Sequence, residues 1–341
     1  MEATIAIINR YNTPAVRADE QILSNEFSTL VFNYRKLKNY FIIIEHFRLI
    51  IWLLFNRRKY KLIYSRFIVH HAFLVTLMGK LLSKKVIVVA AGKGIAAISE
   101  LNYGYQLKRI NRYLFNKTVD WTTSIIAVSE FAKKQVIKFA RRDIQSKITI
   151  IPNGIDTNFF TPQSYNKRKR VITIAGCDNY NRFRLKGIDL YCKIAMHFPT
   201  YEFIAVGIHP NLKSLIKKNH PKNISLLPWC NKDELLDMLN TSSYICQLSL
   251  YETFGVGFAE GMACNCIPIT FSDIGCSELV HNTGILIPMR DKDLIIRSFN
   301  TLFKHDSTSG TPPNQIIEQY FSVNSRKTAL YPFIKQLINS N

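Results

Sequence analysis

The sequence predicts an α/β protein made of two domains, each with a parallel sheet covered by helices on both faces. Short, continuous apolar strands alternate with helical patterns along the chain, which is typical of βαβ units. The length of 341 residues and the 47% share of hydrophobic residues allow two sizeable cores. We expect the first domain at residues 1–164 and the second at residues 165–321, with the two sheets facing across a cleft.

Apolar runs in the first half predict strands, and stretches with helical spacing between them predict helices. The strands are expected at residues 4–8, 29–32, 62–64, 86–91 and 124–128. The helices are expected at residues 40–55, 71–82 and 130–139. A turn is expected at Pro152-Asn153-Gly154, and the polar segment 161–170 is expected to link the two domains.

The second half repeats the alternation and therefore predicts a second sheet of the same kind. Its strands are expected at residues 171–175, 203–207, 224–227, 244–247 and 267–270. Its helices are expected at residues 187–197, 211–218, 233–239, 258–266, 294–303 and 325–338. Ligands of such sheets bind beyond the carboxyl ends of the strands, so the loop after residue 247 is expected at the binding edge.

That loop contains two carboxylates eight positions apart, Glu252 and Glu260, with two glycines between them. Glycine lets a backbone approach a ligand closely, and free N–H groups at the start of a helix attract phosphate. With the helix expected at residues 258–266, Glu260 is expected in its first turn. Ionised carboxylates accept hydrogen bonds from sugar and ribose hydroxyls. A first-turn glutamate also complements the helix dipole, so the spacing alone leaves both interpretations open.

Four segments resemble, in order, the motifs of one enzyme family. Residues 252–263 resemble the E-x7-E signature of the retaining glycosyltransferases of family 4, which have the GT-B fold of two Rossmann-like domains. Residues 184–189 resemble the family's Lys-Gly element, and residues 150–156 resemble its domain-junction motif. A fourth similarity covers residues 272–288, so that the resemblance spans about residues 128–288.

The resemblance implies that the second domain binds a nucleoside-diphosphate sugar, a UDP- or GDP-sugar, without a metal or other cofactor. Lys186 matches the family lysine that stabilises the leaving diphosphate. Arg184 is the preferred neighbouring arginine, and Arg182 is the alternative. In similar proteins the last helix, here at about residues 322–341, packs back on the first domain.

The glutamate loop supplies the other implied donor contacts. Glu252 matches the catalytic position that holds hydroxyls of the transferred sugar, and Glu260 matches the residue that binds the ribose. The backbone at Phe254, Gly255 and Val256 is expected to contact sugar and phosphate. Plain packing of the Phe254 ring remains an alternative.

One departure from the family pattern lies at the end of a first-domain strand. Many members have a His-Gly pair there, near the donor sugar, whereas this chain has Ala91 and Gly92. Lys93, His70 or His71 are candidates to replace the histidine, although His71 is also expected to cap or begin a helix.

The implied reaction is transfer of a sugar to a glycan or lipid-linked acceptor with retention of configuration, in the synthesis of a surface polysaccharide or glycolipid. A sugar-nucleotide epimerase or a phosphorylase on the same fold is an alternative. An epimerase would act on its nucleotide sugar without an acceptor, which distinguishes the two activities.

The strongly basic balance predicts a polyanionic neighbour. Lys and Arg number 45 against 24 acidic residues, which gives a net charge of +21. A nucleic-acid partner is not expected, because neither a helix-turn-helix nor an RNP-type motif is found. An anionic membrane is the other candidate, held by a basic rim around the helix at 40–55. The rim comprises Arg35, Lys36, Lys38, Arg57, Arg58, Lys59 and Lys61. A solvated, lysine-rich surface is the alternative.

The segment 40–55 is the longest apolar stretch, but Glu45, His46 and Arg48 interrupt it. It is shorter than the roughly 20 residues of a membrane span, so an amphipathic helix packed on a sheet is preferred over insertion. The first residues run directly into an apolar strand and not a signal peptide. We therefore expect a cytoplasmic protein, with peripheral attachment to the inner face of the membrane as a further expectation.

Neither the cysteines nor the acidic pairs predict a metal site. The seven cysteines form no C-x-x-C pair and are expected to be reduced and buried. Asp291-Lys292-Asp293 has the D-x-D form of the metal-binding motif in the other glycosyltransferase fold. Because Asp is favoured at helix starts, a cap for the helix at 294–303 is the preferred interpretation.

Overall fold

The computed structural model describes residues 4–35, 42–163, 166–212, 221–304 and 310–340. The chain divides into two compact units. The first unit is Met1–Gly154 with Val323–Asn341, and the second is Ile155–Ser322. The division thus falls at the predicted turn, whereas the sequence analysis placed it after residue 164.

The first unit contains a six-stranded sheet in the order β2-β1-β3-β4-β5-β6, and all its neighbouring strands are parallel. The strands are β1 (Ile5–Asn9), β2 (Thr29–Asn33), β3 (Leu62–Arg66), β4 (Lys85–Ala90), β5 (Ser124–Ala127) and β6 (Ile148–Ile150). β1, β3 and β5 are buried along their whole length, as expected for strands covered on both faces.

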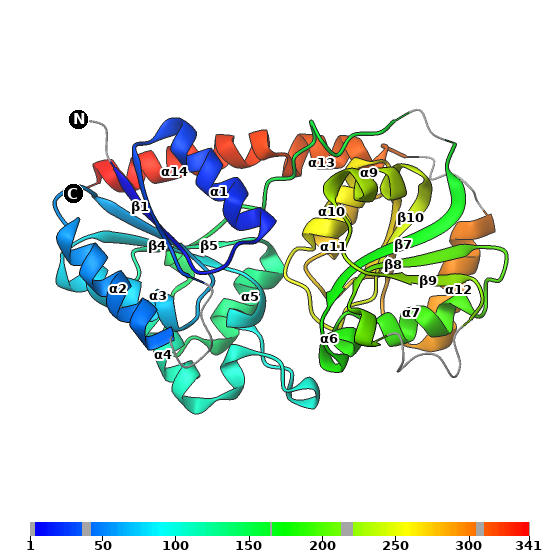
Figure 1. The fold of residues 1–341 in the computed structure, drawn as a ribbon, viewed down its shortest axis with the longest axis horizontal. Coiled ribbons are helices and arrows are strands. Elements are labelled where there is room, and N and C mark those ends of the chain that lie inside the picture. Colours follow the sequence, from blue (N-terminus) through cyan, green and yellow to red (C-terminus); the bar gives the residue numbers. More distant parts are fainter. Residues whose placement is uncertain (1–3, 36–41, 164–165, 213–220, 305–309, 341) are drawn as a thin grey trace. The chain divides into compact units, whose positions relative to one another are not determined.

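Helices cover both faces of this sheet. They are α1 (Pro14–Glu26), α2 (Ile42–Phe55), α3 (His70–Leu81), α4 (Arg109–Trp121), α5 (Glu130–Phe139) and α14 (Val323–Asn339). Figure 1 shows α1 and α14 on one side of the sheet, with α2, α3 and α4 on the other. α1 begins after Thr13, whose hydroxyl accepts a hydrogen bond from the Val16 N–H, and Pro14 takes the first helical position.

The second unit repeats the architecture with a six-stranded parallel sheet in the order β12-β11-β10-β7-β8-β9. Its strands are β7 (Arg168–Cys177), β8 (Glu202–Ile208), β9 (Ile224–Leu227), β10 (Ser242–Gln247), β11 (Ile267–Phe271) and β12 (Ile285–Ile287). The predicted fold class, two α/β domains with parallel sheets, is confirmed.

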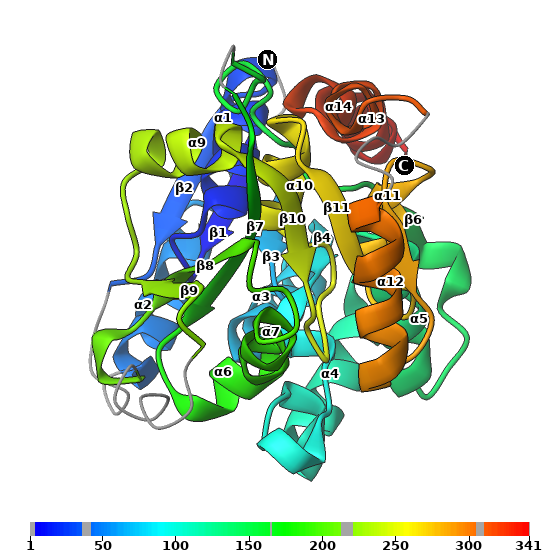
Figure 2. The same cartoon turned by 90° about the vertical axis from the view of Figure 1, so that its right-hand side faces the viewer.

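The second unit's helices also lie on both faces of its sheet. They are α6 (Tyr180–Leu185), α7 (Ile188–Ala195), α9 (Lys232–Asn240), α10 (Val256–Ala263), α11 (Ser277–Val280), α12 (Lys292–Lys304) and α13 (Pro313–Phe321). α9 and α10 cover one face, while α7 and α12 pack together on the other (Figures 1 and 2).

Several element predictions need correction. β7 begins at Arg168, so the last residues of the predicted linker 161–170 are strand. α10 begins at Val256, two residues before the predicted start, because Gly255 adopts a left-handed backbone and ends the loop there. α1, α4, α6 and α13 were not predicted. Most of the helix predicted at 211–218 lies outside the described residues.

A buried ion cluster fixes α14 within the first unit. The Asp19 carboxylate accepts hydrogen bonds from Arg326 at 2.6 and 3.0 Å and also binds Arg66 and the Tyr64 hydroxyl. Arg326 also donates to the Ile151 carbonyl at 2.9 Å. Burial alone raises the pKa of Asp19, but the two guanidinium groups outweigh burial and lower it to about 2. The cluster therefore holds an ionised carboxylate between α1, β3 and α14.

α2 has apolar side chains on its buried face and on its exposed face. The helix is buried through Glu45, Leu49 and Leu53, and Arg48 forms an ion pair with Glu45. Other apolar side chains of α2 face solvent, at Ile43, Ile44, Phe47, Ile51, Leu54 and Phe55. Because Leu49 and Leu53 are fully buried and the Trp52 ring lies 5.5 Å from that of Phe32 in β2, the predicted helix packed on the sheet is confirmed, but its additional exposed apolar face was not predicted. Within the described residues, no helix combines the length and hydropathy needed to span a bilayer.

The cysteines occupy the second unit. All seven are unpaired, and only Cys230 is not buried. Burial raises the pKa of the Cys177 thiol to about 11 and that of the Cys192 thiol to about 12, so these thiols stay protonated near neutral pH.

Candidate functional site

The site centres on the loop between β10 and α10. Gly255 forms the turn into α10 with a φ of 86°, and a Cβ there would lie 2.4 Å from the Cys276 sulfur. The first N–H groups of α10, those of Val256 and Gly257, have no carbonyl partner within the helix because a helix leaves its first donors unpaired. The loop therefore presents backbone donors and a positive helix end at the carboxyl edge of the sheet.

Glu252 and Lys186 meet on this loop. Lys186 Nζ lies 2.6 Å from Glu252 Oε2, and the two side chains are 16% and 18% exposed. Glu252 Oε1 accepts a hydrogen bond from the Thr253 N–H at 2.9 Å. Burial raises the pKa of Glu252, but the Lys186 ammonium outweighs burial and the net pKa is lowered. The pair is therefore ionised and still reachable from solvent.

Close backbone packing brings the two motifs together. Gly187 has a φ of 67° and a Cβ there would lie 1.9 Å from the Leu248 carbonyl oxygen, so only glycine fits. The Leu250 N–H donates to the Leu185 carbonyl at 2.8 Å. The expectation that Lys186 directly precedes a glycine and a helix is met, because Gly187 caps α7.

The fourth motif supports the same loop from the other side. The Gly275 N–H donates to the Glu252 carbonyl at 2.8 Å, and a Cβ on Gly275 would come within 2.2 Å of the Thr253 carbonyl oxygen. The Phe254 side chain is 2% exposed, and its ring centroid lies 6.0 Å from that of Phe321. The ring of Phe254 thus packs in the core, which leaves its backbone as the part available to a ligand.

Glu260 lies in the second turn of α10, as the fifth residue of the helix, and not in the first turn as predicted. The correction follows from the earlier helix start at Val256. Burial raises the pKa of Glu260 to about 7, the Lys232 ammonium opposes this rise, and Asp156 adds to it. None of the described residues hydrogen-bonds the Glu260 carboxylate. The environment of Glu260 therefore differs from that of Glu252, whose carboxylate forms an ion pair with Lys186.

The two candidate arginines lie on α6, in different surroundings. Arg184 is half-buried, and no described residue hydrogen-bonds or ion-pairs with its side chain. Arg182 is 46% exposed and lies 3.8 Å from Asp178 in a solvent-exposed ion pair. Arg184 is therefore the more shielded of the two guanidinium groups, and its role as a ligand for an anion stays a prediction.

The remaining candidates belong to the first unit. Gly92 and Lys93 follow β4, whereas His70 and His71 lie before it, at the start of α3. Gly92 has a φ of 59°, and the exposed Lys93 ammonium lies 5.8 Å from the Tyr103 ring centroid. His71 is fully buried and donates from Nε2 to the Arg66 carbonyl at 3.0 Å. Burial lowers its pKa to about 3, so His71 is a neutral structural residue at the start of α3. His70 is exposed, with Nε2 3.2 Å from Asn111 Oδ1.

Two cations of the second unit were not among the sequence candidates. Arg290 donates to the Ser249 carbonyl at 3.3 Å and pairs with Asp273, so it holds the start of the glutamate loop. Lys232, at the start of α9, is the cation that opposes the rise in the pKa of Glu260. Arg290 lies two residues after the end of the fourth motif, and this closeness is the sequence signal that could have identified it. Nothing in the sequence distinguishes Lys232 from other surface lysines.

The D-x-D segment acts as a helix cap. The Asp291 carboxylate accepts a hydrogen bond from the Leu294 N–H at 2.9 Å at the start of α12, as the sequence analysis preferred. In the part of the chain that the structure describes, no group of three or more His, Cys, Asp or Glu side chains is arranged to hold a metal ion.

Family profiles match both units. The profile "Glycosyl transferases group 1" matches residues 158–319, and the profile "Glycosyltransferase Family 4" matches residues 12–159. Together the two profiles extend well beyond the region in which the sequence motifs were found.

Curated relatives match at low identity. The chain is 24% identical over 177 residues to an uncharacterised glycosyltransferase of Methanocaldococcus jannaschii, across 50% of this chain and 46% of the relative. It is 22% identical over 168 residues to a phosphatidylinositol N-acetylglucosaminyltransferase subunit of Arabidopsis thaliana, across 45% of this chain and 36% of the relative. The chain thus spans less than half the length of the curated relatives it matches.

Solved structures match over nearly the whole chain. A sucrose-phosphate synthase from Thermosynechococcus elongatus superposes with a TM-score of 0.81 at 13% identity, covering 99% of this chain and 100% of that one. HepE from Anabaena, in complex with UDP and glucose, superposes with a TM-score of 0.73 at 14% identity, covering 98% and 100%. These likenesses confirm the predicted GT-B fold.

Proposed function

Since the chain belongs to the GT-B glycosyltransferases of family 4, we propose that it transfers a sugar from a UDP- or GDP-sugar to a glycan or lipid-linked acceptor. In this proposal the reaction retains the anomeric configuration and needs no metal. The product belongs to the synthesis of a surface polysaccharide or glycolipid. The observation that carries the proposal is the contact of Lys186 with Glu252, 2.6 Å apart, beside the start of α10. It combines a phosphate-binding cation, a hydroxyl acceptor and backbone donors in one place. The solved relative HepE has UDP and glucose bound, which agrees with a nucleotide-sugar donor.

The proposed roles follow from the chemistry of each group. Lys186 and Arg184 stabilise the negative charge that develops on the leaving diphosphate, and the first N–H groups of α10 add to this stabilisation. Glu252 accepts hydrogen bonds from the transferred sugar, and Glu260 accepts them from the ribose. Because both carboxylates are held by the same loop and helix, they fix the donor at two points.

Donor binding is testable by thermal shift with a panel of UDP- and GDP-sugars. A ligand that binds only the native state raises the melting temperature by mass action. We expect one nucleotide class to produce a shift, and Glu260→Ala to abolish it while the unliganded protein remains folded. Glu318→Ala, which removes an exposed carboxylate of the same unit, is the matched control. A full shift in Glu260→Ala contradicts the ribose assignment.

The reaction type is tested with the same donor. A glycosyltransferase consumes the donor only when an acceptor is present, and NMR of the product gives the anomeric configuration. Conversion of the nucleotide sugar to an epimer without any acceptor would support the epimerase alternative instead. An inverted product contradicts retention.

We further propose that α2 docks on an anionic bilayer, where a lipid-linked acceptor would be found. The exposed apolar face of α2 supports this, because Ile43, Phe47 and Phe55 are 60%, 62% and 82% exposed. Exposed basic residues adjoin it and complement anionic headgroups. They are Arg35, Arg57, Arg58, Lys59 and Lys61. Lys36 and Lys38 of the predicted rim lie outside the described residues.

Sedimentation with vesicles tests this surface. We expect binding to vesicles that contain phosphatidylglycerol, weaker binding to phosphatidylcholine alone, and a loss of at least about tenfold in Phe47→Glu, which places a charge in the apolar face. Ile110→Gln, at a residue of α4 that is 64% exposed, is the control and is expected to bind as the unchanged protein does. Equal binding by Phe47→Glu would sink the proposal.

A further inference from the structure

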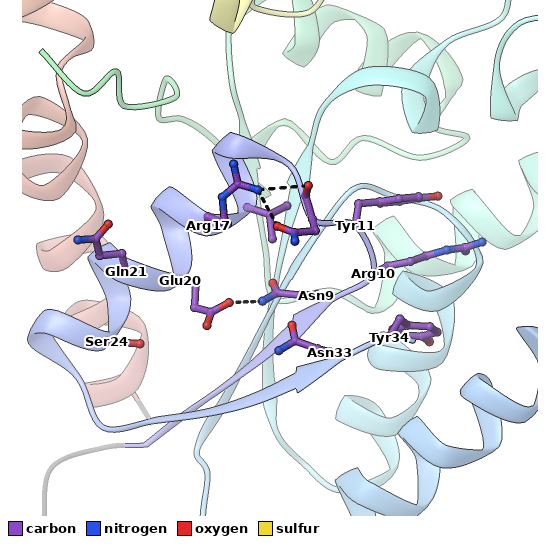
Figure 3. Close-up of a pocket in the computed structure, with 11 residues that line it drawn as sticks. Asn9, Arg10, Tyr11, Arg17, Glu20, Gln21, Ser24, Asn33 and Tyr34 are labelled. Atoms are coloured by element: carbon purple, nitrogen blue, oxygen red, sulfur yellow. Dashed lines mark hydrogen bonds between the residues drawn. The ribbon is translucent and has the colours of Figure 1, made fainter. Parts of the chain in front are cut away.

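Three cavities of the first unit meet at one side chain. Their volumes are about 740, 480 and 330 Å³, and Arg10 is the residue that lines all three. Arg10 directly follows β1, at the carboxyl edge of the sheet, where ligands of such sheets bind. Figure 3 shows Arg10 pointing away from the hydrogen-bonded pair of Asn9 and Glu20, in the same direction as Tyr11.

The Arg10 guanidinium lies 5.3 Å from the Tyr11 ring centroid, but no described acidic side chain pairs with it. Its Nη1 atom is buried, and no described residue hydrogen-bonds or ion-pairs with its side chain. The carboxylates nearby are already engaged, since Glu20 accepts from Asn9 at 2.6 Å and Glu45 is paired with Arg48. A buried N–H group of a charged side chain lowers the stability of the fold when no acceptor binds it, so such groups are rare in folded proteins.

The smallest cavity has the character of an anion site. Lys93 and Lys108 line it together with Arg10, and the described residues around it include no acidic side chain. His70 and Asn111, which hydrogen-bond each other at 3.2 Å, add polar atoms to the same wall. Burial, followed by the charge of Arg10, lowers the pKa of His70, so this imidazole is neutral near pH 7 and can donate or accept without adding charge.

From this geometry we infer that the first unit binds an anionic group of the sugar acceptor, a phosphate or a carboxylate, with Arg10 as its principal ligand. The inference rests on the proposed glycosyl transfer, because it names the chemical class of the acceptor. A guanidinium donates two hydrogen bonds to either anion at once, and the flanking lysines add charge. The diphosphate of the donor has its own proposed ligands in the second unit, so the anion at Arg10 belongs to the other substrate.

The test measures the affinity of the full chain for four probes by thermal shift, each with and without saturating UDP. Glycerol 1-phosphate and dioctanoyl phosphatidate carry a free and a lipid-borne phosphate, methyl glucuronide carries a carboxylate, and methyl glucoside is the neutral control. We expect at least one anionic probe to raise the melting temperature and methyl glucoside not to. Arg10→Gln should weaken that binding at least about tenfold, as expected for loss of a charge-assisted hydrogen bond.

Two further variants keep the result interpretable. Arg10→Lys retains the charge and should bind more tightly than Arg10→Gln, and Arg142→Gln removes an exposed arginine of the same unit and should bind like the unchanged chain. The inference is overturned if Arg10→Gln binds the anionic probes as the unchanged chain does, or if no anionic probe binds. It is also overturned if Arg10→Gln loses only the UDP shift, which would assign Arg10 to the donor. A missing UDP shift with intact anion binding excludes only a UDP-sugar as donor and leaves the inference about Arg10 standing.

Discussion

Each unit contains carboxylates shielded from solvent, but the two units neutralise the negative charge to different degrees. In the first unit, Asp19 is fully enclosed and held by Arg66, Arg326 and the Tyr64 hydroxyl. In the second unit, Glu252 has a single lysine and Glu260 has no hydrogen-bonding partner among the described residues. The pKa values move in opposite directions, to about 2 for Asp19 and to about 7 for Glu260.

This difference distinguishes carboxylates that stabilise the fold from carboxylates that are available to bind a ligand. A carboxylate whose hydrogen-bonding capacity is filled by the protein has nothing left for a ligand, so Asp19 can only stabilise the fold. A carboxylate that is desolvated and underbonded costs stability, and such perturbed groups gather at functional sites. Glu260 fits the second description and Glu252 lies between the two.

The largest expected effect comes from breaking the Asp19 cluster. Asp19→Asn leaves two buried guanidinium groups without a counter-charge, which should lower the free energy of unfolding by about 3–5 kcal/mol. Urea denaturation measures it. The control is Lys335→Ala, which removes the exposed ion pair with Glu26 and should cost less than about 1 kcal/mol. Equal losses in both variants would contradict the structural role of Asp19.

The same cluster predicts an acid limit. The folded-state pKa of Asp19, about 2, lies below the value of 3.8 for the free side chain. The unfolded chain therefore binds more protons in this interval, and the stabilisation is present above pH 3.8 and is lost as pH falls through about 2. This acid-dependent loss should be absent from Asp19→Asn.

The next effect is catalytic. Lys186→Ala removes the cation proposed to stabilise the leaving diphosphate, and kcat should fall by about 10²–10³, as when a preorganised donor is removed from other active sites. Steady-state kinetics with the identified donor measures it. Lys193→Ala, at an exposed lysine on α7, should leave kcat unchanged. An active Lys186→Ala enzyme would mean that Lys186 serves only to pair with Glu252.

The smallest effect has the opposite sign on stability. The folded-state pKa of Glu260, about 7, lies above the ordinary value of 4.5, so the folded protein binds more protons than the unfolded chain in this interval. The free energy of unfolding therefore falls as the pH rises from 4.5 to about 7. Glu260→Gln should therefore be more stable than the unchanged chain at pH 8.5, by about 1–3 kcal/mol. The two should be equal near pH 4. Urea unfolding at both pH values measures this difference. A variant that is less stable than the unchanged chain at pH 8.5 would mean that Glu260 stabilises the fold, as Asp19 does.

The fold was predictable because the strands are continuous apolar runs. β9 was predicted with its observed bounds, and β1, β8 and β11 to within a residue at each end. α1 and α4 were missed because polar residues dominate them, and only tertiary packing reveals which of their faces is buried. The packing of α2 on the sheet was also predictable, but the apolar residues that α2 leaves exposed were not. Its polar stripe includes Glu45, and pairing with Arg48 allows that carboxylate to face inward.

The candidate site was predictable where backbone constraints mark the sequence. Gly187 and Gly255 both have a positive φ, and each adjoins a functional candidate, so the glycine motifs carried the information. The contact between Lys186 and Glu252 joins side chains 66 residues apart, and no local pattern encodes it. Arg10 was missed for the same reason, because its lack of a partner depends on how Glu20 and Glu45 are engaged.

The contact between Arg326 and Asp19 affects the order in which the two units fold during synthesis. Asp19 leaves the ribosome 307 residues before Arg326, although the two bind each other in the finished protein. Because domains generally fold as units during synthesis, the second unit can complete its core first. Until translation reaches α14, the early unit has a carboxylate matched by only one of its two guanidinium groups. The half that is translated first is therefore the last to mature.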